Sequence, residues 1–162
     1  MKICMVSSES VPFSKSGGLA DVVGALSTAL AALGDDIRVI LPLYGSVEAS
    51  AFKKLDITVP VSLLGKREEV TFRQATLDKV VYYFVDHCFY TERGGIYGDT
   101  SHAPYDDNLV RYTLLNKAAM ALVKAVEWKP DVMHCHDWTT GFIPYLMKTS
   151  GDDFWSSTKS VM

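Results

Sequence analysis

A buried strand, an amphipathic helix and a second buried strand follow one another near the start of the chain, and this pattern constrains the fold most. The run KICMVSSE (residues 2–9) is apolar before it becomes polar, and DIRVILPLY (residues 36–44) is a second apolar run. Between them lies a helical stripe at steps of three and four, formed by Leu19, Val22, Val23, Leu26, Leu30 and Leu33. Gly34 then marks the helix end. This pattern predicts a βαβ unit, and hence an α/β fold on a mainly parallel sheet.

More strands are predicted in the rest of the chain. Three β-rich runs follow, at residues 57–65, 68–77 and 79–87. The first two are expected to form a hairpin. Pro60 favours an edge position for the first run, because proline has no N–H to donate to a neighbouring strand. The run DVMHCHD (residues 131–137) is a further strand, and we expect it to lie with the first strand at the centre of the sheet.

An aperiodic stretch and two helices complete the prediction. Residues 88–108 show no hydrophobic period but contain several aromatic side chains, which favours a functional loop over a disordered one. Apolar steps of three and four predict a long helix over roughly residues 105–127. A second helix is expected from Trp138 to about Lys148, with Pro144 in its early part.

Composition excludes several classes of protein. The 162 residues suit one domain or a little more, and a net charge of −3 gives no basic surplus for nucleic acid or an anionic membrane. No apolar run approaches the roughly 20 residues of a membrane helix, and no signal peptide is evident. Cys4, Cys88 and Cys135 are odd in number and widely spaced. They favour free thiols in a reducing, cytoplasmic compartment.

Polar clusters follow three of the predicted strands. They lie at residues 7–9, 86–87 and 136–137. Ligands of open parallel sheets bind beyond the carboxyl ends of the strands, so we expect these clusters to form one site. Glu9, a carboxylate just past the first strand, is a candidate base or a contact for a sugar hydroxyl. The aromatic and acidic residues of 89–107 would suit carbohydrate, although a packed surface loop explains them equally well.

A pair of glycines precedes the first helix. Gly17 and Gly18 would let backbone N–H groups approach an anion at the positive end of the helix, and Lys15 could add a charge for phosphate. No G-x-G-x-x-G or Walker motif is present, and a flexible loop with a solvated lysine is the alternative. Asp21 in the first helical turn suits the helix dipole whether or not it contacts a ligand.

The sequence HCHDW raises the possibility of a metal site. His134 and His136 share one face of the strand, whereas Cys135 and Asp137 share the other. Only two ligands would therefore converge, which is too few for zinc, and no metal is predicted. His136 and Asp137 are better candidates for polar contacts with a substrate. Asp137 could equally cap the following helix, and spacing does not separate these two roles.

Three segments together resemble the bacterial glycogen synthases and plant starch synthases. They are SSESVPFSKSGGLADVVGALSTALAALGDDIRVILPLY, RGGIYGDTSHAPYDDNLVRYTLLNKAAMALV and WKPDVMHCHDWTTGFIPYLMK. The most specific elements are the K-x-G-G-L motif at residues 15–19 and the HxHDW motif at residues 134–138. The resemblance implies a Rossmann-like, mainly parallel sheet with helices on both faces, as the N-terminal half of a GT-B fold.

The resemblance also implies an activity and a set of site residues. Such enzymes transfer glucose from ADP-glucose to the non-reducing end of an α-1,4-glucan, glycogen or starch, with retention and without a bound metal or other cofactor. Lys15, Gly17 and Gly18 would lie by the phosphates of the donor, with Asp21 nearby. The glucose and acceptor side would be lined by Glu9, Tyr97, Asp137 and Trp138, among which Glu9 and Asp137 are the predicted catalytic residues. His136, from its place at the strand end, is added as a predicted substrate contact.

The family pattern continues beyond the residues seen here. Residues 1–162 match an N-terminal Rossmann-like domain, whereas the C-terminal nucleotide-binding domain is absent, so we expect a truncated and inactive fragment. Two alternatives remain open. One is a stand-alone glucan-binding or assembly module without turnover, and the other is a different GT-B sugar-nucleotide transferase. Donor preference, acceptor length, oligomeric state and the role of His87 are left open.

Overall fold

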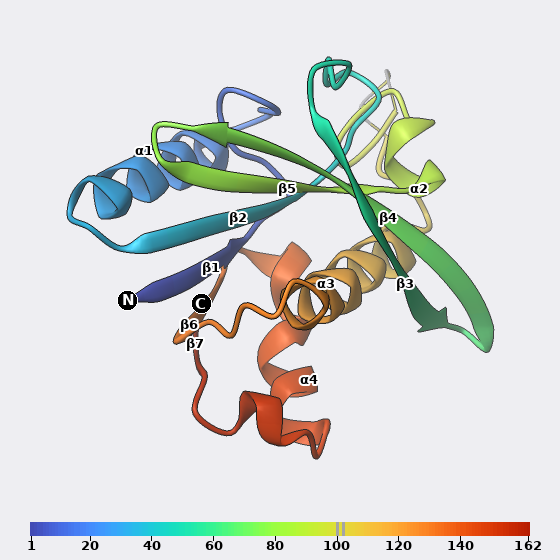
Figure 1. Ribbon diagram of the computed structural model, residues 1–162. Coiled ribbons are helices and arrows are strands. Elements are labelled where there is room, and N and C mark those ends of the chain that lie inside the picture. The colour runs from blue at the N-terminus through green and yellow to red at the C-terminus, as the bar shows by residue number, and fades with distance from the viewer. Residues whose placement is uncertain (100, 102) are drawn as a thin grey trace.

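Figure 1 shows the computed structural model, in which the described residues, 1–99, 101 and 103–162, form a seven-stranded sheet with helices packed on it. The strands in chain order are β1 (Lys2–Val6), β2 (Asp36–Pro42), β3 (Lys53–Leu63), β4 (Lys66–Leu77), β5 (Val80–Asp86), β6 (Val132–Cys135) and β7 (Lys159–Val161). The helices are α1 (Gly18–Ala32), α2 (Cys88–Thr91), α3 (Asn108–Ala125) and α4 (Phe142–Thr149), with short 3-10 turns η1 (Trp138–Thr140) and η2 (Asp153–Trp155).

The sheet is mainly parallel, as the sequence predicts. Its order is β3-β4-β5-β2-β1-β6-β7. Strand β1 pairs in parallel with β2 and β6, so the predicted βαβ unit is confirmed. The hairpin β3–β4 is antiparallel, and β3, which contains Pro60, lies at the edge of the sheet. As predicted, β1 and β6 are interior strands with a neighbour on each side, although the hairpin extends the sheet beyond β5 and places β2 in the middle.

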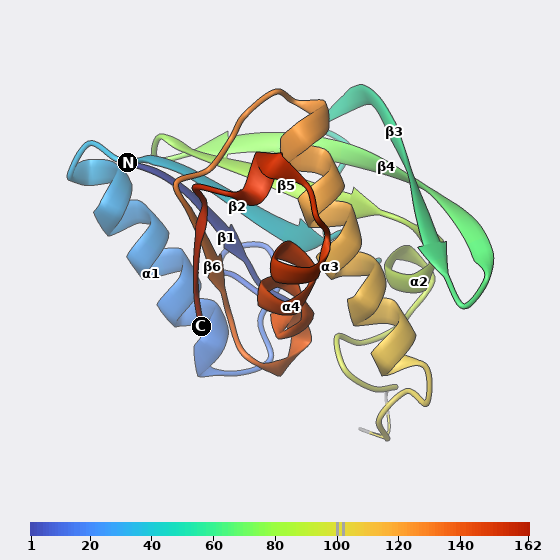
Figure 2. The ribbon, with the colours of Figure 1, turned by 90° about the horizontal axis from the view of Figure 1, so that it is seen from below.

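Strand β1 is buried on both of its faces. Ile3 and Met5 belong to one hydrophobic cluster together with Val23 of α1. Cys4 and Val6, which alternate with them, belong to the other cluster, to which α3 and α4 contribute. Figures 1 and 2 show α1 on one side of the sheet and α3 with α4 on the other. The two helical layers explain why β1 is apolar from Ile3 to Val6 rather than alternating with polar residues.

Helix α1 packs with much of the predicted stripe, because Val23 is buried and Leu19, Leu26 and Leu30 pack against the same cluster. Val22 and Leu33 of the predicted stripe are exposed, at 55% and 82%. The buried face consists largely of small residues, namely Ala20, Val23, Gly24, Ser27 and Ala31. Small side chains bring the helix close to the sheet, and the hydroxyls of Ser27 and Tyr82 lie 3.3 Å apart. Larger apolar side chains such as Leu26 flank this contact and are only partly buried.

The segment between β5 and α3 is partly helical, whereas the sequence predicts a loop over residues 88–108. It begins with α2, and α3 starts at Asn108, three residues later than predicted. Residues 100 and 102 of this segment lie outside the described residues. Pro144 is the third residue of α4, an early position as expected. No helix in the described part of the chain is long and apolar enough to cross a membrane.

Candidate functional site

The glycine turn before α1 faces open space. Gly17 occupies the N-cap position in an extended conformation, with φ −148° and ψ −163°, and supplies no side-chain cap. A Cβ atom added at Gly17 or Gly18 would meet nothing within 4 Å. Neither the backbone conformation of Gly17 nor packing within the chain therefore requires glycine here. The absent side chains instead leave room for another molecule to approach the backbone.

Lys15 forms an ion pair on the surface beside this turn. Its Nζ donates to both carboxylate oxygens of Asp21 at 2.7 Å. The two side chains are 52% and 55% exposed. Exposed ion pairs contribute little to stability, so Lys15 can exchange Asp21 for another anion at small energetic cost. The structure thus places both predicted residues at the glycine turn, paired with each other.

Glu9 lies beneath the turn, three residues after β1. Its side chain is nearly inaccessible, with an exposed fraction for the residue of 2%. The N–H groups of Ser16 and Gly17 donate to its Oε2, the latter at 3.2 Å. The hydroxyls of Tyr97 and Ser16 donate to Oε1 at 2.8 Å and 3.1 Å. This carboxylate therefore connects the glycine turn to the segment that precedes α3.

Tyr97 connects the ends of two strands. Its hydroxyl contacts Glu9 and lies 2.7 Å from the Ser8 hydroxyl, just past β1. Burial is the main cause that raises the pKa of Tyr97 above its ordinary value, so the phenol keeps its proton. Because that proton points to Glu9, Ser8 is the donor in the second contact. The Tyr97 ring lies 6.0 Å from the ring of Trp138, beyond β6.

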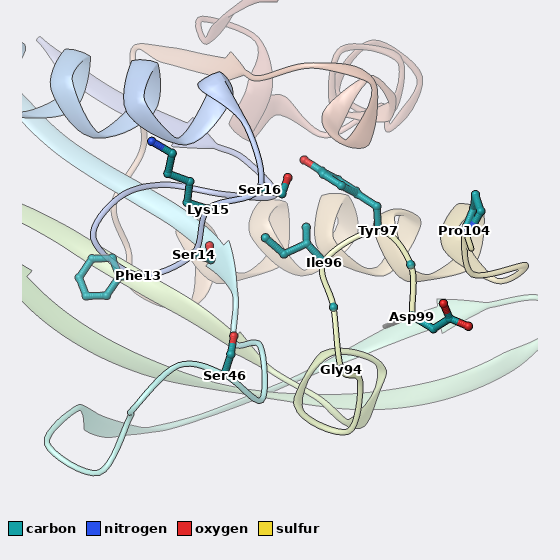
Figure 3. A pocket seen from close by; sticks show the side chains of 12 residues that line it. Phe13, Ser14, Lys15, Ser16, Ser46, Gly94, Ile96, Tyr97, Asp99 and Pro104 are labelled. Atoms are coloured by element: carbon teal, nitrogen blue, oxygen red, sulfur yellow. The ribbon is translucent and has the colours of Figure 1, made fainter. Parts of the chain in front are cut away.

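An open pocket of about 710 Å³ lies between the segment before α1 and the segment before α3. Phe13, Lys15 and Ser16 line one side of it, and Ile96 and Tyr97 line the other (Figure 3). Of the predicted site residues, Lys15 and Tyr97 reach this pocket directly. Glu9 lies behind it, and the glycine pair adjoins it along the chain. Figure 3 shows the hydroxyls of Ser16 and Tyr97 close to each other at the back of the pocket.

One of the three predicted polar clusters does not join this site. Asp86 accepts a hydrogen bond from Arg73 of β4 at 3.0 Å. His87 accepts from the N–H of Phe89, which caps α2, and its Nε2 lies 3.4 Å from Glu68. These side chains thus contact β4, and β2 lies between β5 and β1 in the sheet. The predicted convergence therefore holds for the ends of β1 and β6 alone.

Asp137 has a strained backbone. Its φ of 64° and ψ of −177° lie in a region that is essentially reserved for glycine. The side chain is exposed, and it accepts the N–H of Trp138 at 2.6 Å. Asp137 therefore caps the 3-10 turn η1. The predicted helix after Asp137 is mainly α4, and Gly141 occupies the N-cap of that helix. Non-glycine residues persist in such a conformation at a cost of about 1–3 kcal/mol, and they cluster at functional sites.

Two histidines stack behind Asp137. The rings of His134 and His136 lie 4.1 Å apart, as their common strand face predicts. Burial, with a smaller contribution from His134, lowers the pKa of His136 to about 4, so its imidazole is neutral at pH 7. Its Nε2 has no hydrogen-bond partner among the described residues. No group of three or more potential metal ligands occurs among those residues either.

Arg111 and Asn108 support the site, and the sequence prediction missed both. The fully buried guanidinium of Arg111 donates to the carbonyls of Phe89 and Ile96 at 2.9 Å and 3.0 Å. Asn108 donates to the carbonyl of Tyr97 at 2.7 Å. A signal was present, because Arg111 lies on the apolar face of α3, four residues before Leu115. A charge within an apolar stripe indicates a buried polar role.

Comparisons with known proteins agree on one family. The family described as "Starch synthase catalytic domain" matches residues 2–162. The glycogen synthase of Geotalea daltonii is 40% identical, and that of Clostridium botulinum is 39% identical, each over 99% of this chain and 34% of the relative. The catalytic domain of starch synthase IV from Arabidopsis thaliana, bound to ADP and acarbose, superimposes with a TM-score of 0.84 and 28% identity over 98% of this chain. The chain spans about a third of the length of these relatives.

The strain at Asp137 predicts an unusual order of stability. Asp137→Ala and Asp137→Gly both remove the carboxylate, but only glycine relieves the backbone. We expect the glycine variant to be more stable than the alanine variant by about 1–2 kcal/mol in urea unfolding, after allowance for the greater entropy of unfolded glycine. The same pair at Ser157, an exposed turn residue without a positive φ, should show the opposite order. An alanine variant more stable than the glycine variant at position 137 would show that the backbone there is unstrained.

Proposed function

Because the chain belongs to the family of starch synthase catalytic domains, we propose that residues 1–162 are the N-terminal domain of a glucosyltransferase of glycogen or starch synthesis. The observation that best supports this function is the glycine turn, whose missing side chains leave an open approach to the N-terminus of α1 beside a large pocket. The donor is ADP-glucose and the acceptor is the non-reducing end of an α-1,4-glucan. The second Rossmann-like domain supplies the opposite wall of the cleft, and the enzyme acts in the cytoplasm.

The glycine turn is the proposed site for the diphosphate of the donor. The first N–H groups of α1 have no partner within the helix and lie at its positive end. An incoming phosphate oxygen can reach them because Gly17 and Gly18 present no side chain. Lys15 then leaves Asp21 and pairs with the phosphate, and Asp21 stays close enough to take the lysine back after the nucleotide leaves.

Asp137 is the proposed catalytic residue on the sugar side. Retaining transfer develops positive charge at the anomeric carbon, and an exposed carboxylate held in a strained backbone can stabilise that charge without reorganising. The rings of Tyr97 and Trp138 would pack against the C–H faces of glucose units. Neutral His136 is the proposed polar contact beside Asp137, and its unpartnered Nε2, which is buried in this structure, would have to become accessible to bind a sugar hydroxyl.

A binding module without turnover is the second candidate. The observation that favours it is the open pocket, which the aromatic side chains of Phe13 and Tyr97 line. Such a module would bind glucan through the same aromatic side chains but would leave the donor unchanged. Another GT-B transferase would use the same glycine turn with a different nucleotide or acceptor.

A transfer assay separates these candidates. We expect labelled ADP-glucose and glycogen to give no incorporation with residues 1–162 alone, because positioning requires both walls of the cleft. A full-length enzyme that contains these residues should incorporate label, with ADP-glucose preferred over UDP-glucose. Turnover by the 162-residue chain alone would contradict the two-domain proposal. A full-length protein that binds glucan but transfers nothing would favour the binding module.

Alanine at the glycine turn should affect the donor but not the fold. A methyl at Gly17 or Gly18 meets no atom of the chain, so the free energy of unfolding should change by less than about 1 kcal/mol. We expect kcat/KM for the donor to fall by about tenfold or more in the full-length enzyme. The control is Gly24→Ala, whose methyl would lie 2.5 Å from Cγ2 of Val11 and should destabilise the chain. Unchanged donor kinetics in both turn variants would contradict the proposal that the donor phosphate binds at this turn.

Asp137→Asn tests charge separately from capping. Asparagine caps about as well as aspartate and has the same shape, so the backbone strain at position 137 is unchanged and the melting temperature should be preserved. If the negative charge stabilises the transition state, kcat of the full-length enzyme should fall by about tenfold or more, equivalent to about 1.4 kcal/mol. Initial rates and thermal melts of the same preparation decide the matter. A normal rate in the asparagine variant would show that Asp137 caps η1 and has no catalytic role.

A further inference from the structure

Glu9 is a buried carboxylate whose acceptor positions are all occupied by the chain itself. Its Oε2 accepts the N–H groups of Ser16 and Gly17, and its Oε1 accepts the hydroxyls of Tyr97 and Ser16. A carboxylate offers about four lone-pair sites, so these four donors saturate it. With an exposed fraction of 2%, the residue has almost no surface left for a substrate.

The donors to Glu9 come from opposite sides of the pocket. Ser16 lies in the segment before α1, seven residues from Glu9, whereas Tyr97 lies in the segment before α3, 88 residues away. Both residues line the pocket, and their hydroxyls approach each other at its back (Figure 3). One carboxylate therefore holds the two walls together. We call these contacts of Glu9 with Ser16, Gly17 and Tyr97 the Glu9 cross-link.

We propose that Glu9 is a positioning residue that sets the distance between the glycine turn and Tyr97, and that it is neither the base nor the nucleophile. A base or a nucleophile needs a lone pair within reach of the substrate, and the lone pairs of Glu9 face donors of the chain. This assignment differs from the sequence-based prediction, which made Glu9 catalytic. Its kinetic part rests on the proposed function, whereas its structural part does not.

Glutamine at this position separates hydrogen bonding from charge. In Glu9→Gln, the amide oxygen can face the N–H groups of Ser16 and Gly17, because these groups can only donate. The amide –NH₂ group then faces the two hydroxyls, which can rotate and accept. Tyr97 would in turn donate to Ser8, an arrangement that the 2.7 Å contact between these hydroxyls allows. Glu9→Gln therefore preserves the Glu9 cross-link, whereas Glu9→Ala removes it.

Amide hydrogen exchange of the 162-residue chain tests the cross-link without any assay of activity. We expect the amides of Ser16 and Gly17 to exchange roughly tenfold faster in Glu9→Ala and within about threefold of the wild-type rate in Glu9→Gln. Glu92→Gln is the matched control, because it removes the same charge from an exposed position and should leave these amides unchanged. Unchanged protection in Glu9→Ala would overturn the cross-link.

Kinetics of the full-length enzyme test the positioning role. Glu9→Ala and Tyr97→Phe should each lower kcat, and the double variant should lose less than the product of the two factors, because both changes break one contact. Glu9→Gln should restore most of the rate that alanine loses. A loss of about 100-fold in a Glu9→Gln variant with protected amides would overturn the proposal and make Glu9 a chemical participant. Absence of transfer by the wild-type enzyme would refute the proposed function, while hydrogen exchange would still decide the cross-link.

Discussion

Burial of β1 on both faces is the constraint on which the rest of the site depends. Its side chains alternate between the cluster under α1 and the cluster under α3. Polar groups therefore lie at its two ends, with Lys2 at the amino end and Ser8 and Glu9 beyond the carboxyl end. Since β6 is parallel to β1 and adjacent to it, Asp137 and Trp138 emerge at the same edge of the sheet. The topology thus brings residues that are far apart in the chain to one edge.

The segment between β5 and α3 completes the site, and side chains of α3 fix its backbone by hydrogen bonds. The guanidinium of Arg111 and the amide of Asn108 bind the carbonyls of Ile96 and Tyr97. Tyr97 can then reach Glu9 with its hydroxyl and Trp138 with its ring. The site therefore combines a rigid base with exposed charged groups, namely the Lys15–Asp21 pair and Asp137, which are free to meet a ligand.

Hydrophobic period and turn chemistry predicted much of the fold, because both are local. The βαβ unit and the edge position of Pro60 follow from them. The face of α1 was predicted less well, since small residues rather than Val22 and Leu33 pack on the sheet. The order of the strands, the strained φ of Asp137 and the partners of Arg111 depend on contacts between distant segments. Among the predicted site residues, Lys15, Gly17 and Gly18 were indicated both by the chemistry of a glycine turn before a helix and by the family resemblance, whereas the pairing of Lys15 with Asp21 required the structure.

We propose that the glycine turn receives the diphosphate of the donor and that the pocket beside Tyr97 receives glucan. A crystal structure of the full-length enzyme with ADP and a maltooligosaccharide tests it most directly. The account predicts phosphate oxygens within hydrogen-bond distance of the first N–H groups of α1 and of Lys15 Nζ, which will have left Asp21. It also predicts sugar rings against Tyr97 or Trp138. A nucleotide bound elsewhere, with Lys15 still paired to Asp21 and the glycine turn empty, would contradict it.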